Sequence, residues 1–242
     1  MNKLISYSLY GSDPKYLQGA IRNSLSAKEF FPNWTTRFYC GKDVPFEILR
    51  NLEGLGSQVY AHGNDWHPNG MFWRYYASAD NTYERIIFRD VDSRFSDRDV
   101  VSISQWEESE RSFHIIRDHP FHMTQILGGL FGVTNSQKLL DLPWEKSKDF
   151  GTAVGQDQKF LTKWIYPRLD LSDTLVHDNF FWFEKERFYL EYGKDYTYMG
   201  ESFDENENYS HQLRNVLASH IKSKVNQEKL HLKSILFRKF KS

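Results

Sequence analysis

Short apolar segments alternate with longer amphipathic segments along the first hundred residues, and this alternation constrains the fold more than any other feature. The short segments have the length and composition of strands, while the longer ones repeat apolar side chains at helical spacing. The pattern predicts strands at residues 4–10, 35–40, 58–61 and 85–88, and helices at residues 16–25, 46–52 and 71–79. Strands that alternate with helices predict a mostly parallel sheet covered by helices.

The second half of the chain continues this pattern less regularly. It predicts a helix at residues 100–106, strands at 113–116 and 126–133, a helix at 156–166, a strand at 171–176, and a long helical stretch after about residue 206. Gly128 and Gly129 interrupt the strand predicted at 126–133, and glycines inside a strand mark a bulge or the close approach of a backbone or ligand. We expect a domain at residues 1–205 and a basic helical tail at residues 206–242.

Composition excludes several classes of protein. The 242 residues carry 31 Lys and Arg against 32 Asp and Glu, so the net charge of −1 provides no general attraction to nucleic acid. One cysteine, Cys40, cannot form an internal disulfide, and the N-terminal segment becomes polar too early for a secretory signal. No apolar run approaches the length of a membrane span. These features predict a cytoplasmic protein that binds no nucleic acid.

The most informative motif is an apolar strand that ends in two carboxylates, in the segment IIFRDVDSR at residues 86–94. In open α/β sheets, ligands bind beyond the carboxyl ends of the strands, which is where Asp90 and Asp92 are expected. Two carboxylates that converge there can bind Mg²⁺ or Mn²⁺. Such a pair also recurs by chance, and its other interpretation is a strand-end loop whose carboxylates cap neighbouring residues.

Four further groups can line such a site. Arg74, Arg89 and Arg94 can bind phosphate oxygens, or they can pair with the aspartates. Asp157 lies where a helix is expected to begin. The helix N-terminus can hold this carboxylate rigidly at the site, or Asp157 can be an ordinary helix-terminal charge. His177 ends a predicted strand and can complete a metal shell. His119 and His122 lack a matching third ligand, which favours a loop that lines the pocket over a zinc site.

Taken in order, the motifs of this chain resemble those of nucleotide-sugar glycosyltransferases of the GT-A fold, and more narrowly of bacterial and viral glycosyltransferase-like proteins with an Asp-x-Asp motif. The resemblance covers roughly residues 1–200. The motifs that carry it are Trp73-Arg74-Tyr75, Arg89-Asp90-Val91-Asp92-Ser93-Arg94, Asp118-His119-Pro120-Phe121-His122, Gly128-Gly129 and Gly155-Gln156-Asp157-Gln158. It implies a Rossmann-like, mostly parallel central sheet flanked by helices, followed by a C-terminal helical tail.

The resemblance also implies an activity, a cofactor and site residues. A nucleoside diphosphate sugar is the implied donor, and Mn²⁺ or Mg²⁺ is the implied metal, with a glycan or lipid-linked glycan as acceptor. Asp90 and Asp92 would bind the metal, with His177 as a late third ligand. Asp157 would be the catalytic carboxylate, as a base if the anomeric configuration inverts. Donor binding would involve Tyr10, Gly11, Asp13, Arg74, Asp90, Arg94, Gly128 and Gly129.

Two other functions remain open from the sequence. A Mg²⁺-dependent phosphohydrolase also uses a strand-end Asp-x-Asp pair, although usually on its first strand, whereas Asp90 and Asp92 follow about the fourth. The second alternative is a non-catalytic carbohydrate-binding protein whose tryptophans stack on sugars. The tail at 217–240 predicts an amphipathic helix with six Lys and Arg and one Glu, and Lys241 follows as a seventh basic residue. It would contact an anionic inner membrane surface peripherally, or pack on the domain or a second subunit.

Overall fold

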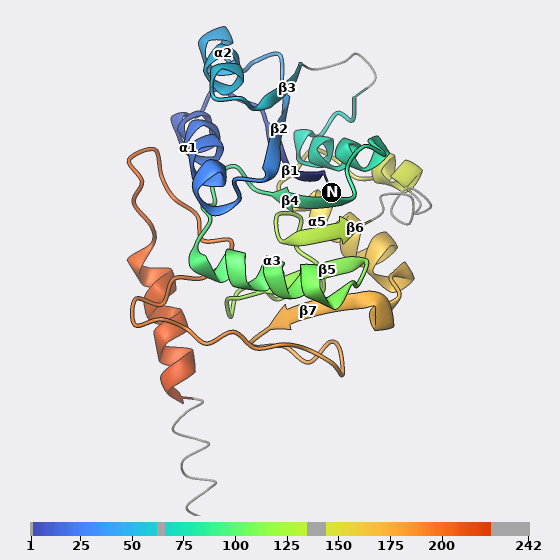
Figure 1. Ribbon diagram of the computed structural model, residues 1–242, viewed down its shortest axis with the longest axis vertical. Helices are drawn as coiled ribbons and strands as arrows, with labels where there is room; N and C mark the ends of the chain where they lie inside the picture. The colour runs from blue at the N-terminus through green and yellow to red at the C-terminus, as the bar shows by residue number, and fades with distance from the viewer. Residues whose placement is uncertain (1, 62–65, 135–143, 224–242) are drawn as a thin grey trace, which may run out of the picture.

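The computed structural model describes residues 2–61, 66–134 and 144–223, and within them it contains one seven-stranded sheet. The strand order is β3-β2-β1-β4-β6-β5-β7 (Figure 1). Among the described strands, β6 alone runs antiparallel to its neighbours. The strands are β1 (Lys3–Leu9), β2 (Trp34–Cys40), β3 (Gln58–Ala61), β4 (Arg85–Arg89), β5 (Phe113–Arg117), β6 (Phe131–Thr134) and β7 (Thr174–Asp178). The expected α/β class with a mostly parallel, helix-covered sheet is confirmed.

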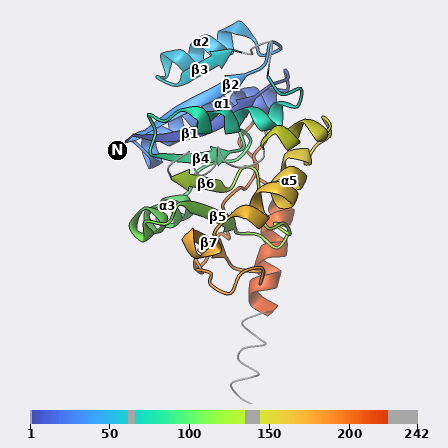
Figure 2. The ribbon, with the colours of Figure 1, turned by 90° about the vertical axis from the view of Figure 1, so that its right-hand side faces the viewer.

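Helices cover both faces of the sheet, and Figure 2 shows α3 and α5 on opposite sides of it. One face carries α1 (Pro14–Phe30), α2 (Phe46–Gly54) and α3 (Asp97–Ser109). The other carries the 3₁₀ helix η1 (Gly70–Ala79), α5 (Gln156–Phe160) and the π-helical turn η3 (Leu161–Ile165). Successive residues of a strand point to opposite faces. Accordingly, Ile5 of β1 packs in the core beneath α1, α2 and α3, and Leu4 packs in the core beneath η1, α5 and η3.

Four predicted elements differ from the structure in type or extent. Residues 71–79 are helical as expected, but as a 3₁₀ helix. The helix predicted at 156–166 begins as α5, changes to π and then 3₁₀ geometry, and ends at Arg168. The strand expected at 171–176 is a 3₁₀ turn followed by β7. The strand expected at 126–133 begins only at Phe131, so the two glycines lie before the strand.

The sheet contains a point where its strand order reverses, and this point places the candidate site. Strand β1 pairs with β2 on one side and with β4 on the other, all in parallel. The register aligns Tyr7 of β1 with Arg89 of β4, so the residues that follow both strands leave the same edge together. In open α/β sheets, ligands bind in the crevice outside such a reversal.

The last described segment packs against the loop that follows β4. The backbone N–H of Phe203 donates to the carbonyl of Asp92 at 2.8 Å, and Ser202 forms an isolated bridge with Ser93. Residues 211–223 form a helix, and residues 224–242, which hold most of the predicted basic tail, lie outside the described residues. The domain boundary after residue 205 therefore stays a prediction. None of the described helices is long and apolar enough to cross a membrane.

Candidate functional site

A cavity of about 360 Å³ lies beyond the carboxyl ends of β1 and β4. Its walls come from four separate segments of the chain. These are the end of β1 with the first turn of α1, the residues that follow β4, the helix η1, and the start of α5. The lining residues are Ser8, Tyr10, Tyr16, Met71, Arg74, Asp90, Val91, Asp92, Val154, Gly155, Asp157 and Gln158. Tyr10, Arg74, Asp90, Asp92 and Asp157, which sequence reasoning selected, therefore meet in one place.

Arg74 joins two of the carboxylates of this cavity. Its Nη1 donates to Asp90, and its Nη2 donates to Asp157 Oδ2 at 2.7 Å. The backbone of Arg74 is itself fixed to β1, since its N–H donates to Ser8 Oγ at 2.9 Å and its carbonyl accepts from Ser6 Oγ at 2.7 Å. The guanidinium of Arg74 thus lies between Asp90, after β4, and Asp157 of α5. The hydrogen bonds to β1 fix the backbone that carries it.

The charge of Arg74 is buried, and its partners stabilise it. Only 4% of the residue is exposed, and burial disfavours the cation. The negative charges of Asp90 and Asp157 outweigh this penalty and hold the pKa of Arg74 above its ordinary value. Its Nε is buried without a hydrogen-bond partner. A buried, unpaired donor beside a polar cavity indicates a place for a further oxygen acceptor.

The two carboxylates of the Asp-x-Asp motif both reach the cavity, and each already faces a cation. Half of the Asp90 side chain is exposed, at 51%, and its partner is Arg74. Asp92 Oδ2 accepts from Lys15 Nζ at 2.7 Å. Burial lowers the pKa of Lys15, but the hydrogen bond and charge of Asp92 raise it beyond that effect. Lys15 was missed by sequence reasoning.

One signal in the sequence does point to Lys15. It lies in the first turn of α1, where the helix dipole disfavours a positive charge. A lysine placed there indicates a compensating anion nearby, and Asp92 is that anion.

The residues present fit a divalent ion only if the ligand supplies part of the coordination shell. The described residues contain no cluster of three or more His, Cys, Asp or Glu that could hold a metal. Mg²⁺ is commonly bound by one or two carboxylates together with substrate phosphates and water. Asp90 and Asp92 match that donor set.

His177 lies outside this group, contrary to the expectation that it completes the metal shell. Strand β7 is separated from β4 by β6 and β5. His177 Nδ1 shares a hydrogen bond with His114 Nε2 at 2.8 Å, and its Nε2 shares one with Gln105 Oε1 at 2.7 Å. Burial lowers the pKa of His177 to about 4. Both ring nitrogens are thus engaged beneath α3.

The Gly128-Gly129 turn touches the same carboxylates, as sequence reasoning suggested for glycines at a close approach. A Cβ on Gly128 would lie 2.4 Å from Asp157 Oδ2, and one on Gly129 would lie 2.0 Å from Asp90 Oδ2. In addition, the Tyr75 hydroxyl donates to the Gly128 carbonyl at 3.3 Å. Side chains at these two positions would collide with the carboxylates, so glycine is needed there.

Three residues expected to bind the donor have other partners. Arg94 Nη2 donates to Glu207 Oε1 at 2.7 Å and so fastens the C-terminal segment. Asp13 caps α1 by accepting from the Lys15 N–H at 2.9 Å. Gly11, at a φ of +79°, donates its N–H to Asp43 Oδ2 at 2.8 Å. These three residues do not line the cavity, whereas their neighbour Tyr10 does.

The residues of the Asp-His-Pro-x-His motif contact other parts of the fold and do not line the cavity. Asp118 forms an ion pair with Arg98, and it accepts the Met199 N–H at 2.9 Å. His119 Nε2 is 3.1 Å from the carbonyl of Leu213 in the C-terminal helix. Burial lowers the pKa of His122 to about 3, which keeps the ring neutral. The expectation that this loop lines the pocket is wrong for the cavity described above.

No protein-family model matches the chain, and no curated protein matches it in sequence. Several solved structures that align with it are named as glycosyltransferases or nucleotidyltransferases. TarS from S. aureus, residues 1–349, aligns over 66% of this chain and 54% of its own, at 14% identity and a TM-score of 0.44. The galactosyltransferase LgtC, in complex with donor and acceptor sugar analogues, aligns over 71% and 73%, at 11% identity and a TM-score of 0.42.

A cytidylyltransferase from Leptospira borgpetersenii aligns over 74% of this chain and 75% of its own, at 12% identity and a TM-score of 0.44. This chain spans about half the length of the TarS fragment and 32% of a longer TarS chain. Similarity of this degree assigns neither an activity nor a substrate to the chain.

Proposed function

We propose that this chain is a metal-dependent glycosyltransferase, which moves a sugar from a nucleoside diphosphate sugar to a glycan or glycolipid acceptor. The observation that carries the proposal is the cavity at the β1–β4 reversal, where Asp90 and Asp157 pair with Arg74 and Asp92 lines the same cavity. Carboxylates with buried cations beside them suit a metal and a diphosphate together.

In this proposal Asp90 and Asp92 hold Mn²⁺ or Mg²⁺, which would supply positive charge to the leaving diphosphate. The protein supplies further cations from Lys15 and Arg74. Tyr10, at the mouth of the cavity, has an exposed ring that can stack on the nucleotide base. These groups are positioned before the donor arrives, which reduces the reorganisation that the reaction requires.

Asp157 is the proposed catalytic carboxylate, and it acts as base if the configuration inverts. Its side chain is 3% exposed and accepts from Arg74 Nη2 at 2.7 Å. A base must reach the acceptor hydroxyl within hydrogen-bond distance, and Asp157 faces the cavity wall next to the Gly128-Gly129 turn. The alternative is that Asp157 only positions Arg74.

Kinetics of Asp157→Asn separate these two roles. A base predicts a loss of kcat by about 10²–10⁴-fold with little change in donor affinity. A positioning role predicts weaker donor binding with a smaller loss of kcat.

The first test is ligand-induced thermal stabilisation with UDP-, GDP-, CMP- and dTDP-sugars, with and without Mn²⁺. We expect one nucleotide class to stabilise the wild type only when Mn²⁺ is present. Asp92→Asn should abolish this effect, whereas Asp97→Asn, a matched change at an exposed aspartate of α3, should preserve it. Stabilisation that ignores both Mn²⁺ and Asp92 would contradict the mechanism.

Transfer is then measured as release of the nucleoside diphosphate with a glycan acceptor present. If no nucleotide binds but sugars do, the carbohydrate-binding alternative gains support. If phosphate is released from simple phosphomonoesters, the phosphohydrolase alternative does.

A further inference from the structure

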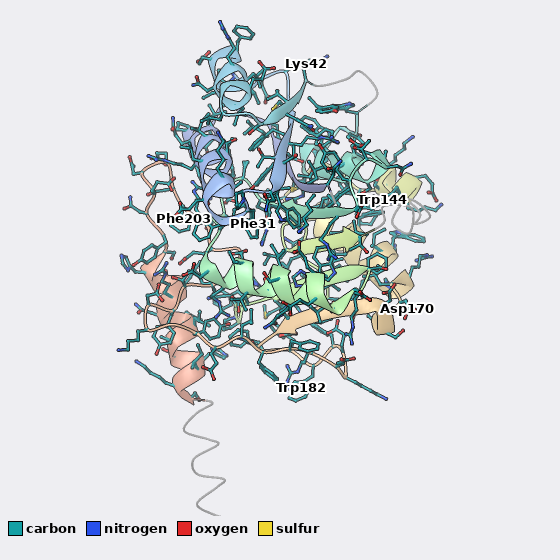
Figure 3. The ribbon with its side chains drawn as sticks, viewed as in Figure 1. Phe31, Lys42, Trp144, Asp170, Trp182 and Phe203 are labelled. Atoms are coloured by element: carbon teal, nitrogen blue, oxygen red, sulfur yellow. The ribbon has the colours of Figure 1, made fainter. Side chains whose placement is uncertain are left out.

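A loop between β7 and the C-terminal helix exposes a group of aromatic side chains. It spans residues 180–189, and it projects at the end of the molecule where Figure 3 labels Trp182. Trp182 is 78% exposed, and three other rings of the loop are also exposed: Phe183, Phe188 and Tyr189. Contiguous exposed apolar groups of this size mark interaction sites on soluble domains.

The loop is anchored, so its exposure is built into the fold. Asp178, at the end of β7, accepts the N–H groups of Phe180 and Phe181, both at 2.8 Å. The fully buried Arg117 donates to Asp178 Oδ2 at 2.7 Å and also pairs with Glu184. Because a buried ion-pair network fixes the start and the middle of the segment, the aromatic rings cannot retract into the core without breaking it.

Both acidic side chains of the loop form ion pairs, although that of Glu186 is 59% exposed. Glu184 is buried in its pair with Arg117, and Glu186 pairs with Arg111 at 2.7 Å. Lys185 is exposed, and the guanidinium of Arg187 lies over the Trp182 ring, 3.4 Å from its centroid. Aromatic rings beside lysine and arginine are the combination found where proteins meet the headgroup region of a membrane.

The C-terminal helix lies beside the loop, and the sequence that follows this helix is basic. The ring of Phe180 lies 6.2 Å from that of His220 in the C-terminal helix. In Figure 1 this helix runs past the loop toward the same end of the molecule. The 19 residues that follow, 224–242, contain six Lys and Arg and one Glu.

We propose that the 180–189 loop inserts Trp182 and Phe183 into the interface of an anionic lipid bilayer, while the neighbouring basic residues bind lipid headgroups. Charge favours lipid over a second copy of this chain, because two copies of this face would bring like charges together. Anionic lipid attracts nearby Lys and Arg side chains. The proposal does not depend on the activity proposed above, although it suits a lipid-linked acceptor.

The test measures partition of the full chain into vesicles of phosphatidylcholine with and without phosphatidylglycerol. We expect binding to the anionic vesicles that weakens with added salt. Trp182→Ser should weaken it about tenfold, the effect of losing about 1.4 kcal/mol of aromatic burial. Trp182→Phe should retain most of it. Phe46→Ser, which removes another exposed ring on the distant α2, should leave it unchanged.

Brominated lipids provide a second readout, because they quench tryptophans that enter the bilayer. The quenched fraction of the fluorescence should disappear in Trp182→Ser. Vesicle binding that is absent in the wild type, or equal in Trp182→Ser and Phe46→Ser, would overturn the proposal. So would a dimer that Trp182→Ser dissociates in the absence of lipid. Nucleotide-induced stabilisation should be unaffected by Trp182→Ser, so this proposal and the transferase proposal can fail separately.

Discussion

Removal of Arg74 should destabilise the protein far more than removal of its exposed partner Asp90. The guanidinium forms two ion pairs that differ in burial, since the side chain of Asp157 is 3% exposed and that of Asp90 is 51% exposed. Arg74→Met leaves the Asp157 charge buried without its cation, which typically costs about 3–5 kcal/mol. Asp90→Asn removes the half-exposed partner, and such pairs contribute about 0–1 kcal/mol.

The assay is urea unfolding followed by circular dichroism, with the melting temperature as a second measure. For a chain of this size, 1 kcal/mol corresponds to a shift of about 2–4 °C. Arg74→Met should therefore lower the melting temperature by about 6–20 °C, and Asp90→Asn by less than about 4 °C.

The double variant Arg74→Met/Asp157→Asn tests the cause of this loss. Because it removes the uncompensated charge together with its partner, it should be more stable than Arg74→Met alone. The reasoning is refuted if Arg74→Met and Asp90→Asn unfold at the same urea concentration. It is also refuted if the two substitutions simply add in the double variant.

Three further predictions concern the surroundings of the cavity. Gly129→Ala should abolish Mn²⁺-dependent nucleotide stabilisation, because its Cβ would lie 2.0 Å from Asp90 Oδ2. Lys15→Met should tighten binding of Mn²⁺ alone by about two- to fivefold in an electron paramagnetic resonance titration, since the ammonium competes for Asp92. The buried His177, with its pKa lowered to about 4, stays neutral in the folded chain while the unfolded chain gains a proton below about pH 6.5. The free energy of unfolding of the wild type should therefore fall between pH 6.5 and 4, and less steeply in His177→Gln, as denaturant titrations across this range can show.

Local patterns in the sequence were enough to predict most of the sheet and to place Asp90 and Asp92 at the cavity. Strand and helix periodicities depend on neighbouring residues, and the carboxylates of Asp90 and Asp92 directly follow β4, so their place at the sheet edge could be inferred. The direction of β6 could not, because it is set by long-range pairing with β4 and β5. The role of the two glycines depends on the close approach of Asp90 and Asp157, which only the folded chain brings together.

Long-range pairs account for the failures at the site. Arg94 was expected at the donor because it flanks the Asp-x-Asp pair, yet its partner Glu207 lies 113 positions along the chain. His177 was expected at the metal because it ends a strand, but its strand is separated from β4 by two others. The position of a residue at the end of a strand predicts which edge of the sheet it reaches. Which side chains it contacts there depends on the order of the strands and on segments far along the chain.

The charges gathered at the cavity connect this geometry to metal dependence. Three carboxylates, Asp90, Asp92 and Asp157, face two cations, Arg74 and Lys15, so the group carries one net negative charge. A nucleoside diphosphate sugar brings about two more negative charges, and like charges in a partly buried cavity repel strongly. A divalent ion makes the group net positive before the donor binds. Mn²⁺ or Mg²⁺ is therefore expected to be required for donor affinity as well as for the rate of transfer, and tight binding of a nucleotide without metal would be inconsistent with this charge balance.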